Sequence, residues 1–450
     1  MILNPLTQEI VSMCRREVPI DVRLKAALHV LDWLGCSIYG LRYLHGKSLM
    51  NYLRDVPEGS ANALGAGKKY FEQAAFHNAC LGNIAEMDDV HRSSILHPGP
   101  VVIPVALAVA EHTGASGGKM LDAIVRGYEV MIRIGQFLGP KHYEFFHNTS
   151  TAGSFGAAAA AADLLELSDE QFIWALGNAG TRTGGFWQMR HEPCMSKSLH
   201  SGLAAQNGML AALLAKRNFT GPKHILEGPH GLFKAIAPDG SPIEIILEPE
   251  APFRILDVSF KPWPACRHAH PAIDAALKLK STLAPGSEFS AIEIHTYADA
   301  ITFCDKPEPR VEIEAKFSIQ HAVAVALIKN KPALDDFSPP FDNPKISALR
   351  KIVSLHADPA ITREYPKHYG ARIEATLLTG ERVQAAVTDA WGDPAVPLNI
   401  QDIDAKFSTL LSKVGVLPGL IAELSRAVKQ LPDQKSLGEF SRLLARVKAG

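Results

Sequence analysis

The feature that most constrains this chain is a helix-forming segment without a polar face. Residues 153–165 are mostly small and apolar, and six of them, Ala157 to Ala162, are consecutive alanines. A helix that is apolar all round is usually buried, and small side chains let neighbouring helices approach closely. Apolar residues also recur at helical spacing from about residue 20 to 215. The sequence therefore predicts a large body of packed helices.

The composition changes near residue 217, where segments rich in glycine and proline begin. Beyond them, residues 291–297 and 371–378 alternate apolar and polar side chains, as strands do. From about residue 400 the pattern is helical again, and a tail this short buries little surface alone. We therefore predict a mainly α protein with a large all-helical domain formed by both chain ends (residues 1–250 and 391–450). A smaller α+β domain (residues 251–390) is inserted between them.

Charge and cysteine usage exclude several classes of partner. The 46 Lys+Arg and 47 Asp+Glu leave a net charge of −1, which gives no overall field to attract nucleic acid or an anionic membrane. The six cysteines are scattered, as is typical of reduced thiols in the cytoplasm. The N-terminal residues lack a signal-peptide pattern, and the most apolar run is too short to span a bilayer. We expect a cytoplasmic protein with neither a nucleic acid nor a membrane as partner.

Familiar cofactor and nucleophile motifs are missing from the sequence. We find no GxxxxGK[ST] phosphate loop, no HExxH zinc motif and no GxSxG nucleophile elbow. The pair His268 and His270 has no third ligand nearby in the sequence, which makes it a weak metal motif. The sequence therefore predicts neither a metal nor a cofactor.

Two polar segments lie between apolar helices in the first half of the chain. Residues 86–97 bring together three carboxylates and two imidazoles, with Glu86, Asp88, Arg92 and His97 as candidates for substrate binding or proton transfer. The alternative is that the acidic residues only cap helices. Residues 141–150 place Tyr143 and His147 just before the alanine-rich helix, where a loop can face a pocket. The alternative there is that Tyr143 merely packs its ring.

Two further segments carry cations. Lys197 stands at the entry of a largely apolar helix, and a partly desolvated lysine can act as a general base or acid. The alternative is a lysine whose ammonium reaches the solvent. Lys261, Arg267 and His268 lie in a proline-stiffened loop before another helix, an arrangement suited to a carboxylate ligand. The alternative for this loop is a solvated basic segment.

Several segments together resemble the MmgE/PrpD family, which includes 2-methylcitrate dehydratases, cis-aconitate decarboxylases and iminodisuccinate epimerases. The resemblance covers nearly the whole chain and is carried by residues 86–92 with 97–99, 178–180, 196–202, 261–268 with 270–274, and 314–318. It implies a homodimer. It also implies a metal-free cleft between the two domains, in which small polycarboxylates undergo proton transfer.

The resemblance also assigns site residues. It makes Lys197 the active-site lysine and matches Glu86, His97, His147 and Lys261 to positions of the family site. Two positions depart from the decarboxylases. Cys266 stands where they have a histidine, and Phe303 stands where they have a tyrosine.

These observations predict an enzyme that removes a proton next to a carboxylate of a small di- or tricarboxylate. Lys197 is the expected base and Tyr143 the opposing acid. Because both departures remove groups that a decarboxylase uses, an isomerase, an iminodisuccinate-type epimerase, is the first choice. A carbon–oxygen lyase of the 2-methylcitrate dehydratase type is the second, with His97 or His147 protonating the departing hydroxyl. A cis-aconitate-type decarboxylase and a non-catalytic binding paralogue are further alternatives.

Overall fold

The computed structural model describes residues 4–192, 194–241 and 247–448. Its contacts divide the chain into two compact units. The helical unit comprises Met1–Val258 and Asn399–Gly450, and the α+β unit comprises Ser259–Leu398. These boundaries lie a few residues beyond the predicted ones at 250 and 391. The predicted fold class, mainly α with a small α+β part, is confirmed.

The helical unit is built around α8 (Asn148–Leu164), the predicted apolar helix, which is buried along nearly its whole length. It packs against α6 and α10. A Cβ atom on Gly156 would lie only 2.6 Å from that of Met131, so small residues are what permit this close approach. The other helices before the insertion are α1 (Leu6–Cys14), α2 (Ile20–Gly40), α3 (Leu44–Tyr52), α4 (Phe71–Ile84), α5 (Gly99–Thr113), α6 (Gly117–Phe137), α7 (Pro140–Phe145), α9 (Asp169–Gly180), α10 (Ser196–Lys216) and α11 (Leu232–Ile236).

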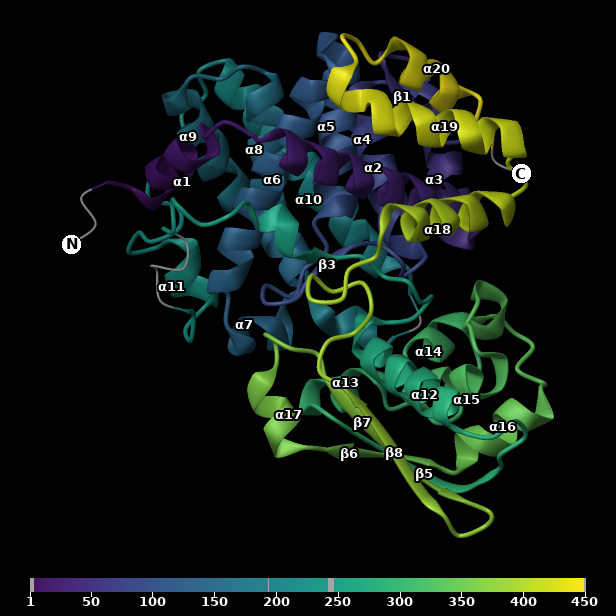
Figure 1. Ribbon diagram of the computed structural model, residues 1–450. Coiled ribbons are helices and arrows are strands. Elements are labelled where there is room, and N and C mark those ends of the chain that lie inside the picture. The colour runs from purple at the N-terminus through teal and green to yellow at the C-terminus, as the bar shows by residue number, and fades with distance from the viewer. Residues whose placement is uncertain (1–3, 193, 242–246, 449–450) are drawn as a thin grey trace. The chain divides into compact units, whose positions relative to one another are not determined.

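The C-terminal tail belongs to the helical unit, as expected for a segment too short to bury a core alone. It forms α18 (Ile400–Ser412), α19 (Pro418–Gln430) and α20 (Gly438–Ala445). Figure 1 shows α18, in yellow, beside the purple α2. The buried side chains of Phe407 and Leu410 pack against α2 at Gly35, where a Cβ atom would lie 3.2 Å from the Phe407 ring.

The α+β unit contains a four-stranded sheet in the order β6-β5-β7-β8. Its strands are β5 (Phe289–Thr296), β6 (Val353–Ala357), β7 (Ala371–Leu377) and β8 (Arg382–Val387). Strand β5 pairs parallel with β6 and antiparallel with β7, and the hairpin from β7 to β8 turns at Gly380, whose φ is +88°. Both segments with alternating side chains are therefore strands, as predicted.

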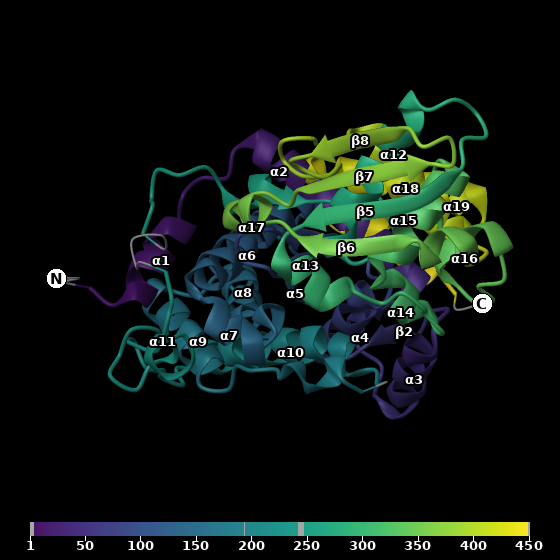
Figure 2. The same ribbon diagram turned by 90° about the horizontal axis from the view of Figure 1, so that it is seen from below.

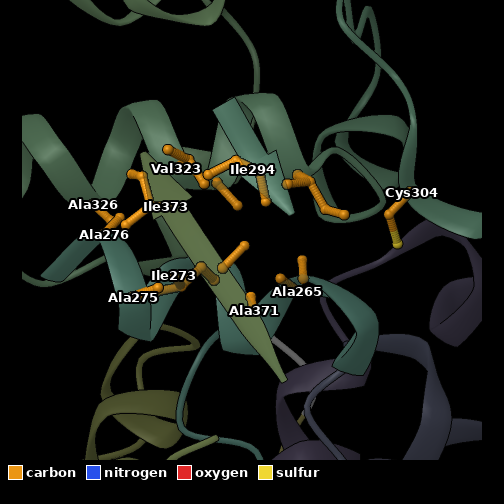
Figure 3. Close-up of a cluster of buried hydrophobic side chains, with 14 of the residues drawn as sticks. Ala265, Ile273, Ala275, Ala276, Ile294, Cys304, Val323, Ala326, Ala371 and Ile373 are labelled. Atoms are coloured by element: carbon orange, nitrogen blue, oxygen red, sulfur yellow. The ribbon is translucent and has the colours of Figure 1, made fainter. Parts of the chain in front are cut away.

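Helices cover one face of this sheet. Figure 2 shows α12 (His270–Thr282) and α15 (Ile319–Lys329) behind the strands, and Figure 3 shows Ile294 and Ile373 of the sheet packed with Ile273 and Val323 of these helices. Further helices in this unit are α13 (Ala298–Cys304), α14 (Glu312–Lys316), α16 (Pro344–Lys351) and α17 (Pro359–Glu364). Among the described residues, no helix is both long and apolar enough to cross a lipid bilayer.

Candidate active site

The segment between α4 and α5 directs its carboxylates inward. Glu86, Asp88 and Asp89 are each at most 3% exposed, which rules out a solvated acidic face. Glu86 adopts a left-handed backbone conformation with a φ of 58°, and a residue with a β-carbon pays a steric cost there. Buried carboxylates are costly unless they are paired or hydrogen-bonded. Each of these three has such a partner.

Glu86 forms an ion pair with Lys197, one of the predicted site residues. Lys197 lies in the first turn of α10, and the two residues come from segments 111 positions apart. The Glu86 side chain is 3% exposed, whereas that of Lys197 is 21% exposed. The structure therefore pairs a buried carboxylate with a lysine whose side chain is partly exposed.

His97 is oriented by the same acidic segment. Its Nδ1 lies 2.9 Å from Asp88 Oδ2 and 2.9 Å from the main-chain oxygen of Asp89. Asp88 also accepts a 2.8 Å hydrogen bond from Asn83. Because both oxygens require a donor, Nδ1 carries a proton and Nε2 is the nitrogen available for proton transfer. Asp88 thus acts on His97, and its predicted direct contact with substrate stays a prediction.

Asp89 has a structural role. It accepts hydrogen bonds from the Tyr128 hydroxyl at 2.7 Å and from the Gly99 main-chain nitrogen at 2.9 Å, and lies 2.7 Å from His29 Nδ1. Gly99 is the first residue of α5. The helix-capping interpretation therefore describes Asp89, which fixes the start of α5, but not Glu86 or Asp88.

A pair of imidazoles, His147 and His200, lies next to the Lys197–Glu86 and His97–Asp88 pairs, which together form the acid–base cluster. The Nδ1 atoms of His147 and His200 are 3.1 Å apart, and the His147 ring centroid is 6.5 Å from that of His97. Burial and the positive charge of Lys197 lower the pKa of His200 to about 4. Burial, together with the nearby charge of Lys197, holds the pKa of His147 well below its usual range. Both imidazoles are therefore neutral at physiological pH.

Tyr143 reaches this cluster through an aromatic contact. Its ring packs edge-on against Trp187, with centroids 5.6 Å apart, and Trp187 lies 4.5 Å from the His147 ring. The structure therefore places the predicted tyrosine and histidine around one indole ring. Arg92 is half-buried just after β3 (Val90–His91), and its predicted contact with substrate stays a prediction.

Three predicted binding residues belong to the α+β unit. Lys261 is buried at 1% exposure. Arg267 forms a buried ion pair with Asp393. His268 Nδ1 lies 2.8 Å from the Tyr297 hydroxyl, and its ring stacks on Phe303 and Tyr369. These contacts are with protein groups, so the substrate-binding parts of Lys261, Arg267 and His268 stay predictions.

The paired histidines of that loop do not resemble a metal site. His270 Nδ1 lies 3.0 Å from the Arg267 guanidinium, and its Nε2 lies 3.1 Å from the Ala265 carbonyl. A guanidinium cation repels a metal ion at the first nitrogen, while the carbonyl oxygen occupies the second. This donor set does not fit a metal.

Sequence reasoning missed a buried ion pair beneath the acidic segment. The Lys406 ammonium on α18 lies 2.6 Å from Asp32 and 2.5 Å from the Met87 carbonyl oxygen. Burial, with the nearby Asp89 and Asp88 carboxylates, raises the pKa of Asp32 to about 6 in spite of Lys406. One signal was available, because Lys406 lies among the buried apolar positions of an amphipathic helix.

Acidification is expected to destabilise the protein as the pH falls from about 6.5 towards 4. Burial lowers the pKa of His77 and His200 to about 4 and that of His91 to about 3, from 6.5 in the unfolded chain. The unfolded chain then binds protons more tightly, so stability present above pH 6.5 is lost as the pH falls. Asp32 has a raised pKa and acts in the opposite direction, but it is one group against three histidines. Urea unfolding at a series of pH values checks it, and a constant midpoint between pH 7 and 5 would contradict it.

The chain is similar to known enzymes over most of its length. Residues 5–244 match the MmgE/PrpD N-terminal domain, and residues 263–419 match the MmgE/PrpD C-terminal domain. A cis-aconitate decarboxylase-like protein of Aspergillus oryzae is 26% identical over 431 residues, 88% of each chain. The cis-aconitate decarboxylase of Mus musculus is 28% identical, over 82% of this chain and 78% of its own. The 2-methylcitrate dehydratase of Cupriavidus necator is 27% identical, over 75% and 73%. With both domains matched, this chain belongs to the MmgE/PrpD family.

Proposed function

We propose that this chain is a lyase that removes a proton next to a carboxylate of a small tricarboxylate and expels a hydroxyl group. The observation that carries the proposal is the Lys197–Glu86 ion pair in the same cluster as the His97–Asp88 pair. One pair holds a candidate base and the other a candidate acid. The names of the similar proteins, decarboxylases and a dehydratase, support lyase chemistry.

Lys197 is the proposed base. A lysine accepts a proton only in its neutral form, so Lys197 first passes a proton to its ion-pair partner Glu86 in this proposal. The neutral amine then takes the proton from the carbon next to the substrate carboxylate. The ammonium that results lies beside the negative charge that develops on the substrate and stabilises it.

His97 is the proposed acid. The C–H electron pair forms the new double bond, the C–O bond breaks, and the hydroxyl leaves as water with a proton from His97 Nε2. Asp88 beside Nδ1 stabilises the imidazolium before this transfer. His147 suits this step poorly, because its pKa lies well below the usual range and it rarely holds a second proton.

Dehydration fits this chain better than decarboxylation. At the two positions where the decarboxylases have a histidine and a tyrosine, the chain has Cys266 and Phe303. Cys266 is 8% exposed in the core of the α+β unit, and Phe303 stacks on His268. Neither side chain replaces the acid–base group that the resemblance leads one to expect.

An epimerase remains a second candidate. Epimerisation needs one proton-transfer group on each face of the stereocentre and no acid for a leaving group. Tyr143 supports it, because its ring shares Trp187 with His147. We place the epimerase second because the His97–Asp88 pair has a clear role only in a reaction that expels a hydroxyl group.

The proposal is tested by incubating the protein in D2O with 2-methylcitrate, citrate, cis-aconitate and iminodisuccinate. If a hydroxy acid is the substrate and the ultraviolet absorbance rises as a conjugated double bond forms, the result supports the dehydratase proposal. Deuterium uptake with a changing optical rotation but no new absorbance would show an epimerase instead of a dehydratase. Carbon dioxide release replaces it with the decarboxylase, and binding without exchange or turnover indicates a non-catalytic paralogue.

A further inference from the structure

The outer face of the sheet in the α+β unit gathers a set of metal-ligating side chains. Glu293 and His295 are two residues apart on β5 and therefore share one face. Glu374 on β7 is the direct cross-strand partner of Glu293, and His356 on β6 is the direct partner of His295. This face is opposite the one that carries Ile294 and Ile373, which pack on α12 and α15 (Figure 3). The hydrogen-bonded strands thus fix four ligand positions.

The donor atoms lie close together. His295 Nε2 is 3.7 Å from Glu293 Oε2 and 3.8 Å from Glu374 Oε1, and one ligand atom from each of the three residues lies within 4.8 Å of the others. His356 Nε2 is 4.0 Å from Glu293 Oε2, and its ring stacks on His295 at 5.2 Å. Two ligands of a tetrahedral zinc ion lie about 3.4 Å apart, given Zn–N and Zn–O bonds of about 2.1 Å. Small side-chain rotations therefore close the site.

Neighbouring side chains satisfy only some of the donor atoms and charges in this cluster. Arg372 Nε lies 2.9 Å from Glu374 Oε1, and Ser354 Oγ lies 3.0 Å from His356 Nε2. Yet His295 Nε2 is inaccessible to solvent and has no hydrogen-bond partner among the described residues. Two carboxylates directly opposite each other on paired strands also repel. A divalent cation would satisfy the imidazole nitrogen and offset this repulsion, and its binding would displace the Arg372 guanidinium from Glu374 Oε1 and the Ser354 hydroxyl from His356 Nε2.

We propose that Glu293, His295 and Glu374, with His356 as a fourth ligand, bind a divalent transition-metal ion such as Zn²⁺. Imidazole and carboxylate donors suit this class of ion. The ion would join β5, β6 and β7 and stabilise the α+β unit. The site shares no residue with the proposed acid–base cluster, so the two proposals stand or fall separately.

Calorimetric titration of the full chain with Zn²⁺, in a buffer that does not chelate metals, tests the site. We expect one equivalent to bind, to be removed by EDTA and to raise the unfolding temperature. His295→Ala and Glu374→Gln are each expected to weaken binding by at least about tenfold, since the first removes a ligand atom and the second removes the negative charge of another. His356→Ala is expected to weaken it less, because that side chain completes the site.

His224→Ala is the matched control, because His224 forms an exposed pair with Glu227, 2.7 Å apart, in the helical unit. The His224→Ala variant is expected to bind Zn²⁺ with the same affinity and stoichiometry as the unsubstituted chain. The unfolding temperatures of all variants in EDTA report whether each one folds. The proposal is overturned if the chain binds no Zn²⁺, or if folded His295→Ala and Glu374→Gln variants bind it unchanged.

Discussion

Replacing Lys197 with alanine is expected to lower turnover on the order of 10³-fold while leaving the fold intact. The side chain is 21% exposed, so its loss removes the proposed base without opening a cavity in the helical core. It does leave the buried Glu86 carboxylate without its ammonium, so the free energy of unfolding should fall while the fold is retained. Positioned general bases contribute about 10²- to 10⁴-fold to rate. Because the amine acts in the transition state, we expect kcat to fall more than KM rises. Steady-state kinetics on the substrate identified in the D2O experiment measures both.

A control on the same helix separates this effect from a general loss of charge. Lys216 is exposed at the C-terminal end of α10, and Lys216→Ala is expected to keep full turnover. Lys197→Arg tests the chemistry more sharply. An arginine can keep the ion pair with Glu86 but does not give up its proton, so this variant should be nearly as inactive as Lys197→Ala. If Lys197→Arg retains most of the activity, Lys197 binds substrate and is not the base.

Local sequence patterns were enough to predict the helical body and strands β5 and β7, but not strand β6. The alanine-rich segment that became α8 is buried because a helix without a polar face has no stable exposed orientation. Strands β5 and β7 alternate between buried and half-exposed or exposed side chains, as their sequences predict. Lys197 and His97 were also predicted as site residues from sequence, because polar side chains between apolar helices are conspicuous, and their catalytic roles stay predictions.

The pairing of distant groups was not predictable in this way. His147 and His200 lie 53 residues apart, and Lys406 lies 319 residues from Met87. Such contacts depend on how helices pack, which no local pattern encodes. The metal-ligating face has the same origin, because the neighbours of Glu293 and His295 follow from the strand order β6-β5-β7. Alternation showed which residues share a face of β5, but not which strands lie beside it.

Lys406→Met is expected to lower the free energy of unfolding near pH 7.5 by about 3–5 kcal/mol, the range for breaking a buried ion pair. The Lys406 and Asp32 side chains are only 7% and 1% exposed. Methionine fills a similar volume but leaves the Asp32 carboxylate buried without its ammonium. Turnover should fall as well at temperatures where the variant is folded, because Lys406 holds the Met87 carbonyl next to Glu86 and Asp88. Urea unfolding and steady-state kinetics measure the two effects.

The pH dependence of this loss identifies its cause. Asp32 already has a pKa of about 6, raised from 3.8 by burial, and removing Lys406 takes away a charge that lowers it. A carboxyl group with a raised pKa in the folded state is tolerated while protonated, and its cost appears as the pH rises through that pKa. The destabilisation by Lys406→Met should therefore be smaller at pH 5 than at pH 7.5. Adding Asp32→Asn, which removes the stranded charge, should restore much of the loss. Lys435→Met, an exposed position in the same tail, should change little. A loss that is equal at both pH values, and that Asp32→Asn does not relieve, would mean that Lys406 stabilises the tail by packing alone.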